Sequence, residues 1–129
     1  PILAAEPPLP EMPRMNNGPR ALDHPLYALL LAEDIAGFNA RRAAGEAVSL
    51  QGAMLRGLDL RGLDARDLDL RDACLRGCDL RGIDLRHAQL AGATITEARV
   101  SGCWFPDDFT ADEIRLALEK GTRLRISRR

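Results

Sequence analysis

Aromatic residues and net charge are both scarce in this chain. Only 4% of its 129 residues are Phe, Trp or Tyr, and 18 Lys and Arg against 19 Asp and Glu leave a formal net charge of −1. A near-neutral chain has neither the basic excess of a typical nucleic-acid-binding domain nor the acidic excess of a nucleic-acid mimic. The low aromatic content favours a narrow interior built from aliphatic side chains.

A long apolar run and a cysteine framework are also missing. No stretch approaches the ~20 apolar residues of a membrane-spanning helix, and no basic and then apolar leader opens the sequence. The three cysteines form no C-x-x-C pair and no His/Cys ligand spacing, so we expect neither a metal nor a cofactor. An odd thiol count favours a reducing compartment. We therefore predict a cytoplasmic protein with Cys78 and Cys103 buried and Cys74 at the surface.

What the chain does contain is a five-residue repeat. Residues 48–105 form twelve consecutive units, the last cut short after three residues. The first residue of each unit is small or aliphatic and the third is apolar, a period that matches neither a helix nor a strand. The third positions are the predicted core of the repeats: Leu50, Leu55, Leu60, Leu70, Leu75, Leu80, Leu85, Leu90, Ile95, Val100 and Phe105, with Ala65 in the remaining unit.

The spacing within a unit predicts how the repeats fold. Two apolar residues placed two apart share one face of a short extended segment, and the other residues of the unit must turn the chain. Four such turns close a square coil, and successive coils stack about 4.8 Å apart. Three coils rise only about 15 Å, so we expect the open ends of the stack to be covered.

The units resemble the consensus of pentapeptide-repeat proteins, which is Ala, then Asp or Asn, then Leu, then two freer residues. The resemblance covers 58 of 129 residues. It implies an all-β core, a short right-handed quadrilateral β-helix of about three coils, here with N- and C-terminal α-helical caps. The chain departs from the consensus where Leu58, Leu63, Leu68 and Ile83 replace Ala. Ala65 stands where Leu is expected, and its pairing with Leu63 indicates an exchange of large and small side chains that conserves interior volume.

We divide the chain into five segments. They are a Pro-rich N-terminal extension (1–22), a helical N-cap (23–46), the pentapeptide-repeat β-helix (47–106), a C-terminal capping helix (107–122) and a basic tail (123–129). The extension holds six of the eight prolines, a composition that favours extended chain over a core.

Local signals predict helices in both caps. Pro25 and Asp34 are start signals for one broken helix or two short helices over residues 25–44. In the C-terminal cap, Thr110 can cap a helix that Gly121 ends, and Glu113 can reach back to the start of that helix. The alternation of Leu124 and Ile126 with Arg allows a short edge strand after it.

Arginine follows the central residue in seven consecutive units, and Asp occupies many of the neighbouring outward positions. These surface Arg rows comprise Arg56, Arg61, Arg66, Arg71, Arg76, Arg81 and Arg86. The acids and bases of residues 48–105 cancel, which indicates a self-neutralising Asp–Arg lattice whose exposed pairs each contribute little. The alternative is an Arg surface for an anionic partner, either a phosphate or an acidic protein.

Candidate partner contacts lie in the caps and tails. They are Tyr27, Leu31, Trp104, Arg123, Arg125, Arg128 and Arg129. Trp104 points outward by register, so it is either covered by the following helix or an exposed anchor for another chain. The terminal arginines form a solvated tail or bind an acidic surface or a nucleic-acid backbone.

No nucleophile with a positioned base, facing carboxylates or metal spacing is present, so we predict that the chain is not an enzyme. We interpret it as a structural or protein-interaction module, an accessory subunit that docks on another protein, in a hetero-complex or homo-oligomer, through its Pro-rich extension and caps. The resemblance offers one alternative, a DNA gyrase modulator, which the short and neutral repeat region disfavours. A second alternative is weak binding of an anionic partner or nucleic acid through the Arg rows, where the interleaved Asp would repel phosphates.

Overall fold

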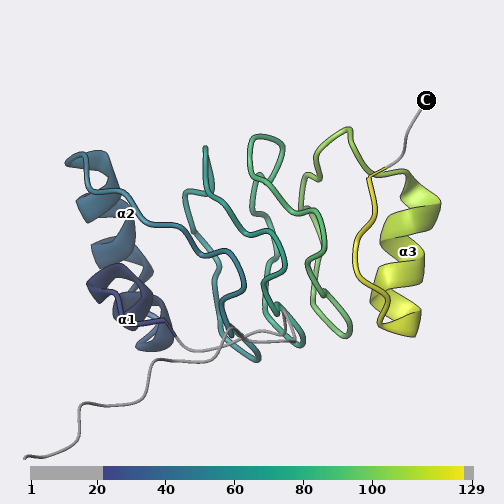
Figure 1. The fold of residues 1–129 in the computed structure, drawn as a ribbon, viewed down its shortest axis with the longest axis horizontal. Helices are drawn as coiled ribbons and strands as arrows, with labels where there is room; N and C mark the ends of the chain where they lie inside the picture. The colour runs from purple at the N-terminus through teal and green to yellow at the C-terminus, as the bar shows by residue number, and fades with distance from the viewer. Residues whose placement is uncertain (1–21, 127–129) are drawn as a thin grey trace, which may run out of the picture.

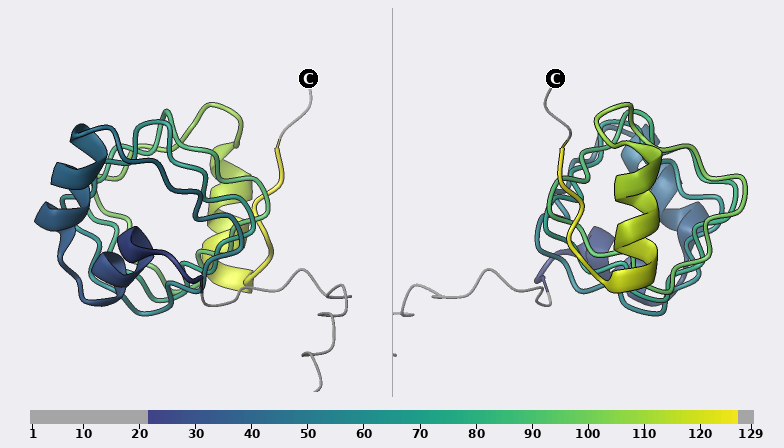
Figure 2. Two further views of the ribbon diagram at one scale, coloured as in Figure 1. Left: turned by 60° about the vertical axis from the view of Figure 1, so that its left-hand side comes forward. Right: turned by 90° about the vertical axis from the view of Figure 1, so that its right-hand side faces the viewer.

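A computed structural model of the chain describes residues 22–126, which form a stack of coils with helices at both ends (Figure 1). Helices α1 (Pro25–Leu31) and α2 (Ile35–Ala43) lie at one end of the stack, and helix α3 (Ala111–Lys120) lies at the other. Seen along the stack, α3 crosses the opening of the last coil (Figure 2). Of the two arrangements expected over residues 25–44, one broken helix or two short helices, the structure has two short helices, and the helix expected after Thr110 is also present.

The predicted fold class is wrong. Within residues 22–126 the structure has no β-strand and no sheet, so the expected all-β core, a right-handed quadrilateral β-helix, is absent. The only regular secondary-structure elements in this range are the three helices. The repeats pair instead through seven isolated parallel bridges, each between residues 20 apart: Ser49 with Asp69, Met54 with Cys74, Asp59 with Asp79, Asp69 with Gln89, Cys74 with Thr94, Asp79 with Arg99 and Asp84 with Trp104.

The five-residue period itself prevents strands from growing. In a typical unit the amide of Leu75 donates to the Thr94 carbonyl at 2.8 Å, and the amide of Cys74 donates to the Ala53 carbonyl at 2.9 Å. The chain then turns at once, because the amide of Cys78 donates back to the carbonyl of Leu75 at 3.1 Å. Each of the seven coil-to-coil bridges uses a single residue of its unit before the next turn, so no ladder of neighbouring paired residues forms between the described coils.

The last residue of a unit takes a left-handed conformation at most corners. Gly77 has φ 69°, as a four-residue turn with its third residue at positive φ requires. Asp67, Asp72 and Glu97 occupy the same slot at φ 57°, 59° and 62° without being glycine. The frequent glycine in this slot is therefore explained by the left-handed backbone of the corner, which glycine adopts without strain.

The interior is filled by the third residues of the units. Nine of them are at most 1% exposed: Leu50, Leu55, Leu60, Leu70, Leu75, Leu80, Leu85, Leu90 and Ile95. Val100 and Phe105, in the last coil, are only partly buried and pack against this core. Aliphatic side chains therefore occupy the axis of the stack, which leaves the ends and the outward faces as surfaces for function.

The N-terminal helices supply the hydrogen bonds that a preceding coil would have made. The Tyr27 hydroxyl donates to the Met54 carbonyl at 2.7 Å, and the Asp59 amide donates to the Glu33 carboxylate. Asn39 accepts from the Asp64 amide at 2.9 Å and donates to the Gly62 carbonyl at 2.8 Å. Because an open coil edge presents unpaired backbone groups, these side chains close it against further pairing.

Arg42 completes this closure at the corner of the first coil. Its guanidinium donates to the carbonyls of Asp64 at 2.8 Å and Arg66 at 2.7 Å, and lies 5.9 Å from the centre of the Phe38 ring. Phe38, Leu26 and Leu30 are fully buried beneath the helices. The cap is thus held by an apolar cluster at its centre and by side-chain hydrogen bonds along its rim.

Helix α3 and the segment after it close the other end. The Thr110 hydroxyl accepts from the Glu113 amide at 3.1 Å, and Gly121 ends the helix at φ 77°. The expected return of the Glu113 side chain to the helix start is absent, because its carboxylate accepts from the Arg125 guanidinium and amide instead. The edge strand suggested for residues 123–126 is not formed, yet buried Leu124 exchanges backbone hydrogen bonds of 2.8 and 2.9 Å with residues 92 and 93 of the last coil.

Enlarging Ala65 tests the predicted exchange of large and small side chains. Ala65 is 2% exposed and Leu63 is 6% exposed. We expect Ala65→Leu to lower the free energy of unfolding by about 1–3 kcal/mol through overpacking. Adding Leu63→Ala should recover part of that loss, because total volume is restored. Urea unfolding of the two single variants and the double variant gives the free energy of unfolding of each. If the losses of the single variants add up in the double variant, the two side chains do not share space.

Candidate functional site

The outward faces of the coils carry a regular lattice of ion pairs. Arg81 is typical: its guanidinium donates to the two oxygens of Asp79 at 2.8 and 2.6 Å, and its amide donates to the same carboxylate at 3.2 Å. The same two-residue pairing recurs in Arg61 with Asp59, Arg66 with Asp64, Arg71 with Asp69 and Arg86 with Asp84. Such forked pairs fix both partners in one geometry.

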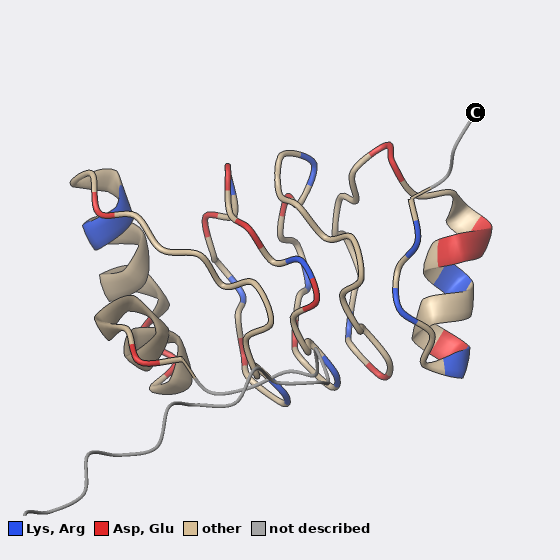
Figure 3. Ribbon diagram, viewed as in Figure 1, with Lys and Arg blue, Asp and Glu red and all other residues tan. Residues whose placement is uncertain are grey.

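The arginines set the acidity of their partners. Hydrogen bonds from the guanidinium and amide of Arg81 lower the pKa of Asp79 to about 2, and Arg86 lowers the pKa of Asp84 to about 2 in the same way. Arg61 also approaches Asp79 at 3.4 Å and links two coils. Positive and negative residues are therefore interspersed along the described coils (Figure 3).

Acidification should loosen this lattice. Since the pKa values of Asp79 and Asp84 are lower in the folded chain than in the unfolded one, their pairs stabilise the fold above about pH 4 and lose that contribution as the pH falls towards about 2. We expect the thermal unfolding midpoint to be flat near neutral pH and to fall across this window. Asp79→Asn should show a smaller fall than the parent chain, and an equal fall in both would contradict the assignment.

One outward column lacks carboxylates. Met54, Cys74 and Thr94 stand above one another in bridged positions where the other columns carry Asp, and we call them the carboxylate-free column. Of the two arginines that follow it in sequence, Arg76 pairs with Glu97 at 2.9 Å. Arg56 is exposed and makes no ion pair with another residue in the range 22–126. This face of the stack therefore differs chemically from the other three.

Trp104 is the largest exposed apolar side chain of the described chain. It is 59% exposed. Of the two environments expected from the register, the side chain is therefore exposed and is not covered by the following helix. The guanidinium of Arg86 lies 4.8 Å from the centre of its ring. Asp84 in turn pairs with Arg86 at 2.8 Å, so the residue that contacts the Trp104 ring is itself held by a neighbour.

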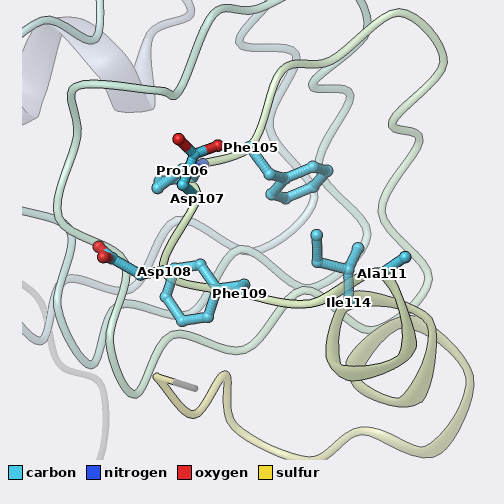
Figure 4. A pocket seen from close by; sticks show the side chains of 7 residues that line it. All are labelled: Phe105, Pro106, Asp107, Asp108, Phe109, Ala111 and Ile114. Carbon is cyan, nitrogen blue, oxygen red and sulfur yellow. The ribbon is translucent and has the colours of Figure 1, made fainter. Parts of the chain in front are cut away.

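An open hollow lies next to Trp104 in sequence, at the junction of the last coil and α3 (Figure 4). Its lining consists of Phe105, Pro106, Asp107, Asp108, Phe109, Ala111 and Ile114. In Figure 4 the carboxylates of Asp107 and Asp108 point away from the two phenyl rings and do not face each other. The hollow therefore offers the edges of two phenyl rings at the end of the stack and no paired acid and base.

The remaining predicted contacts are scattered. Tyr27 is 3% exposed and bonded to the first coil, so that candidate partner contact is a closure residue of the cap. Leu31 is 48% exposed at the end of α1. Arg125 is bound to Glu113, and Arg123 lies 3.9 Å from Asp72. The structure thus brings none of these residues next to Trp104. Arg128 and Arg129, like residues 1–21 of the Pro-rich extension, lie outside the described residues.

The thiols differ from expectation at two positions. Cys74, predicted at the surface, is only 8% exposed because it stands between Met54 and Thr94 in the column, and Cys103, predicted buried, is partly exposed. Burial raises the pKa of Cys78 to about 11 and that of Cys103 to about 12. Neither of these two thiols is therefore an activated nucleophile at neutral pH.

Other kinds of site find no support within residues 22–126. No group of three or more His, Cys, Asp or Glu side chains converges there as a metal ion would require. None of the helices α1–α3 has the length and apolar character needed to cross a bilayer. The surfaces that remain for binding are the exposed apolar side chains and the carboxylate-free column.

Sequence reasoning missed the residues that close the first coil. The sequence predicts no role for Glu33, Asn39 and Arg42, whereas in the structure they satisfy backbone groups of residues 59–66. The three-residue spacing of Asn39 and Arg42 places them on one face of α2 and was the available signal. Which coil edge they would meet depended on how the cap docks, which no local pattern specifies.

Comparison with known proteins agrees with the repeat period. The family profile described as "Pentapeptide repeats" matches residues 46–82 and 75–105, in 8 copies. No curated protein and no solved structure matches the chain. The resemblance seen in the five-residue units is thereby confirmed, and this chain is a pentapeptide-repeat protein over residues 46–105.

Proposed function

We propose that this chain is a non-enzymatic protein-interaction module that binds another protein, a different chain or a second copy, through its ends. The observation that carries the proposal is the 59% exposure of Trp104, the one tryptophan of the sequence. Exposed aromatic side chains of this size are enriched among residues that dominate binding energy in protein interfaces. In a larger assembly such a module would serve as an accessory subunit.

The surroundings of Trp104 support this role. Arg86 stacks on the ring at 4.8 Å and is itself held by Asp84, so the anchor loses little side-chain freedom when a partner binds. The hollow lined by Phe105 and Phe109 follows Trp104 directly in sequence, at the junction of the last coil and α3. Of the other large exposed apolar side chains, Leu31 lies at one end of the stack and Ile126 at the other.

The charge pattern weighs against the gyrase-modulator and anion-binding alternatives. Five arginines of the rows are already engaged by the Asp two residues before them, so those guanidinium groups are not free for phosphate. The same pairs neutralise the carboxylates that imitation of DNA would need. A non-enzymatic role fits the filled interior, where the central leucines are at most 1% exposed.

Affinity capture from the native host with the full chain and with Trp104→Ala tests the proposal. We expect the variant to lose its stoichiometric partner at least about tenfold, as truncation of a central aromatic anchor does. Thr94→Ala is the matched control, because it truncates an outward side chain of the same coil away from Trp104. Equal capture by all three proteins would refute the role of Trp104.

Salt dependence separates apolar docking from the alternatives. Binding through Trp104 and the hollow should survive an increase from about 50 to about 200 mM salt, whereas contacts with nucleic-acid phosphates weaken by orders of magnitude over that range. A different result would favour the gyrase-modulator alternative: both the parent chain and Trp104→Ala would capture topoisomerase subunits, and this capture would be lost at high salt.

A further inference from the structure

The C-terminal cap leaves half of the last coil uncovered. On the covered half the inward residues are buried: Ala88, Leu90, Ala93 and Ile95. On the other half they are only partly buried: Ala98, Val100, Cys103 and Phe105. Their equivalents one coil earlier are at most 2% exposed: Cys78, Leu80, Ile83 and Leu85. In the right-hand view of Figure 2 the coils extend beyond α3 on the side opposite the segment that follows it. We call residues 98–105 the open edge.

The backbone of the open edge is unpaired as well. One coil earlier, the amides of Leu80 and Leu85 donate to carbonyls of the last coil at 2.8 and 2.7 Å. The carbonyls of Cys78 and Ile83 each accept from the last coil at 2.9 Å. The matching groups of the open edge make no hydrogen bond within residues 22–126: the amides of Val100 and Phe105 and the carbonyls of Ala98 and Cys103. These donors and acceptors form a template for one more paired segment.

We propose that a partner protein adds a single extended segment to the open edge and pairs with it in place of a further coil. This inference rests on the proposed function, since Cys103 and Phe105 flank Trp104 in the chain. A peptide that joins an exposed backbone edge gains affinity from its main chain and specificity from alternate side chains. Because α3 crosses the end of the stack, the flat coil end of a second copy cannot approach to the pairing distance of about 4.8 Å, whereas a single chain fits beside α3 (Figure 2).

The repeats themselves indicate which side chains such a segment carries. Leu80 and Leu85 fill the interior beneath the open edge, so the residues stacked on its other side should also be apolar and five positions apart. Asp107 and Asp108 directly follow the edge, are exposed and make no ion pair within residues 22–126. A basic residue just after the second apolar residue, where Arg86 stands one coil earlier, complements their charge.

Amide hydrogen exchange of the full chain, followed by NMR, tests whether the edge is open. We expect the amides of Val100 and Phe105 to exchange at least about tenfold faster than the paired amides of Leu80 and Leu85. Equal protection of all four amides would show that the edge is already covered and would overturn the proposal. Protection that develops only at high protein concentration, with a doubled mass in sedimentation, would place a second copy there and would also contradict it.

A synthetic peptide with the sequence of residues 78–86 and the change Cys78→Ala is the probe for the partner segment. It repeats the pattern that a further coil would place over the open edge and ends in a base. With about 2 mM peptide, a Kd of about 1 mM or tighter should slow exchange at Val100 and Phe105 at least about threefold, because two thirds or more of the chain is then bound. Exchange at Leu80 and Leu85 should not change.

The matched control is the same peptide methylated on the amide nitrogens of its residues 79 and 84. The amides at these positions would donate to the Ala98 and Cys103 carbonyls, as those of Arg99 and Trp104 donate to the coil before them. We expect the methylated peptide to give no protection. No slowing by the first peptide, or equal slowing by both, would overturn backbone pairing at the open edge.

The open-edge proposal and the proposed function can fail separately. If a partner is captured by the parent chain and lost in Trp104→Ala, but the captured complex shows no protection of Val100 and Phe105, the proposed function stands and the open-edge proposal is wrong. If the peptide protects these two amides while the parent chain and Trp104→Ala capture partners equally, the open edge is supported and the anchor role of Trp104 is refuted.

Discussion

Phe38→Ala is expected to lower the free energy of unfolding by about 3–5 kcal/mol, the usual loss when a buried phenyl ring is truncated. Phe38 is fully buried between α2 and the first coil, together with Leu26 and Leu30. Its ring also lies 5.9 Å from the Arg42 guanidinium, which binds the carbonyls of Asp64 and Arg66. Loss of the ring therefore removes apolar contacts and loosens the side chain that closes the coil edge.

The location of this loss is as informative as its size. Since coils contact only their neighbours, damage at the cap should open the cap and first coil before the rest. We expect hydrogen exchange in Phe38→Ala to accelerate first in residues 25–43 and at the coil edge of residues 59–66. Leu31→Ala is the control, because Leu31 is 48% exposed and its truncation should change stability by less than about 0.5 kcal/mol. Uniform acceleration over all coils would show that the cap does not open separately.

Leu75→Ala is expected to cost about 2–5 kcal/mol, with a different signature. Leu75 is 1% exposed in the middle coil, where its amide bonds to Thr94 and its carbonyl accepts from Cys78. A cavity there weakens contacts with the coils on both sides, so the whole stack should be destabilised together. Urea unfolding followed by circular dichroism should show a lower midpoint, and Cys78 should become reactive to alkylation at a lower urea concentration.

Comparison with an isosteric change separates packing from local geometry. Leu75→Met keeps most of the volume and should cost less than about 1.5 kcal/mol. If Leu75→Ala proved as mild as Leu75→Met, the axis of the stack would not be tightly packed. An effect confined to the hydrogen exchange of residues 73–78 would equally show that the coils are not energetically coupled.

The closure of both ends explains how so short a stack limits pairing through its coil edges. At one end Tyr27, Asn39 and Arg42 satisfy backbone groups of the first coil with side chains. At the other end buried Leu124 pairs by its backbone with residues 92 and 93. Unpaired coil edges would otherwise be templates for association with other chains. For the proposed function, closure of these edges favours binding through side-chain surfaces such as Trp104 over backbone pairing where the caps cover the stack.

The sequence by itself determined the period, the interior and the ends of the helices, because each of these depends on local spacing. An apolar third residue in every unit predicted which side chains fill the axis, and Thr110 and Gly121 predicted where α3 begins and ends. The short bidentate pairs were equally local, since Arg81 and its equivalents bind an Asp only two residues away.

Only the tertiary structure decided how far pairing extends and what each end covers. Pairing stops at single bridges because a corner follows every bridged residue, so the strands implied by the resemblance are absent from residues 22–126. The exposure of Trp104 depended on the path of the chain between Pro106 and α3, and the burial of Tyr27 depended on how α1 docks on the first coil. Contacts between segments far apart in sequence are fixed by docking geometry, which no pattern of neighbouring residues encodes.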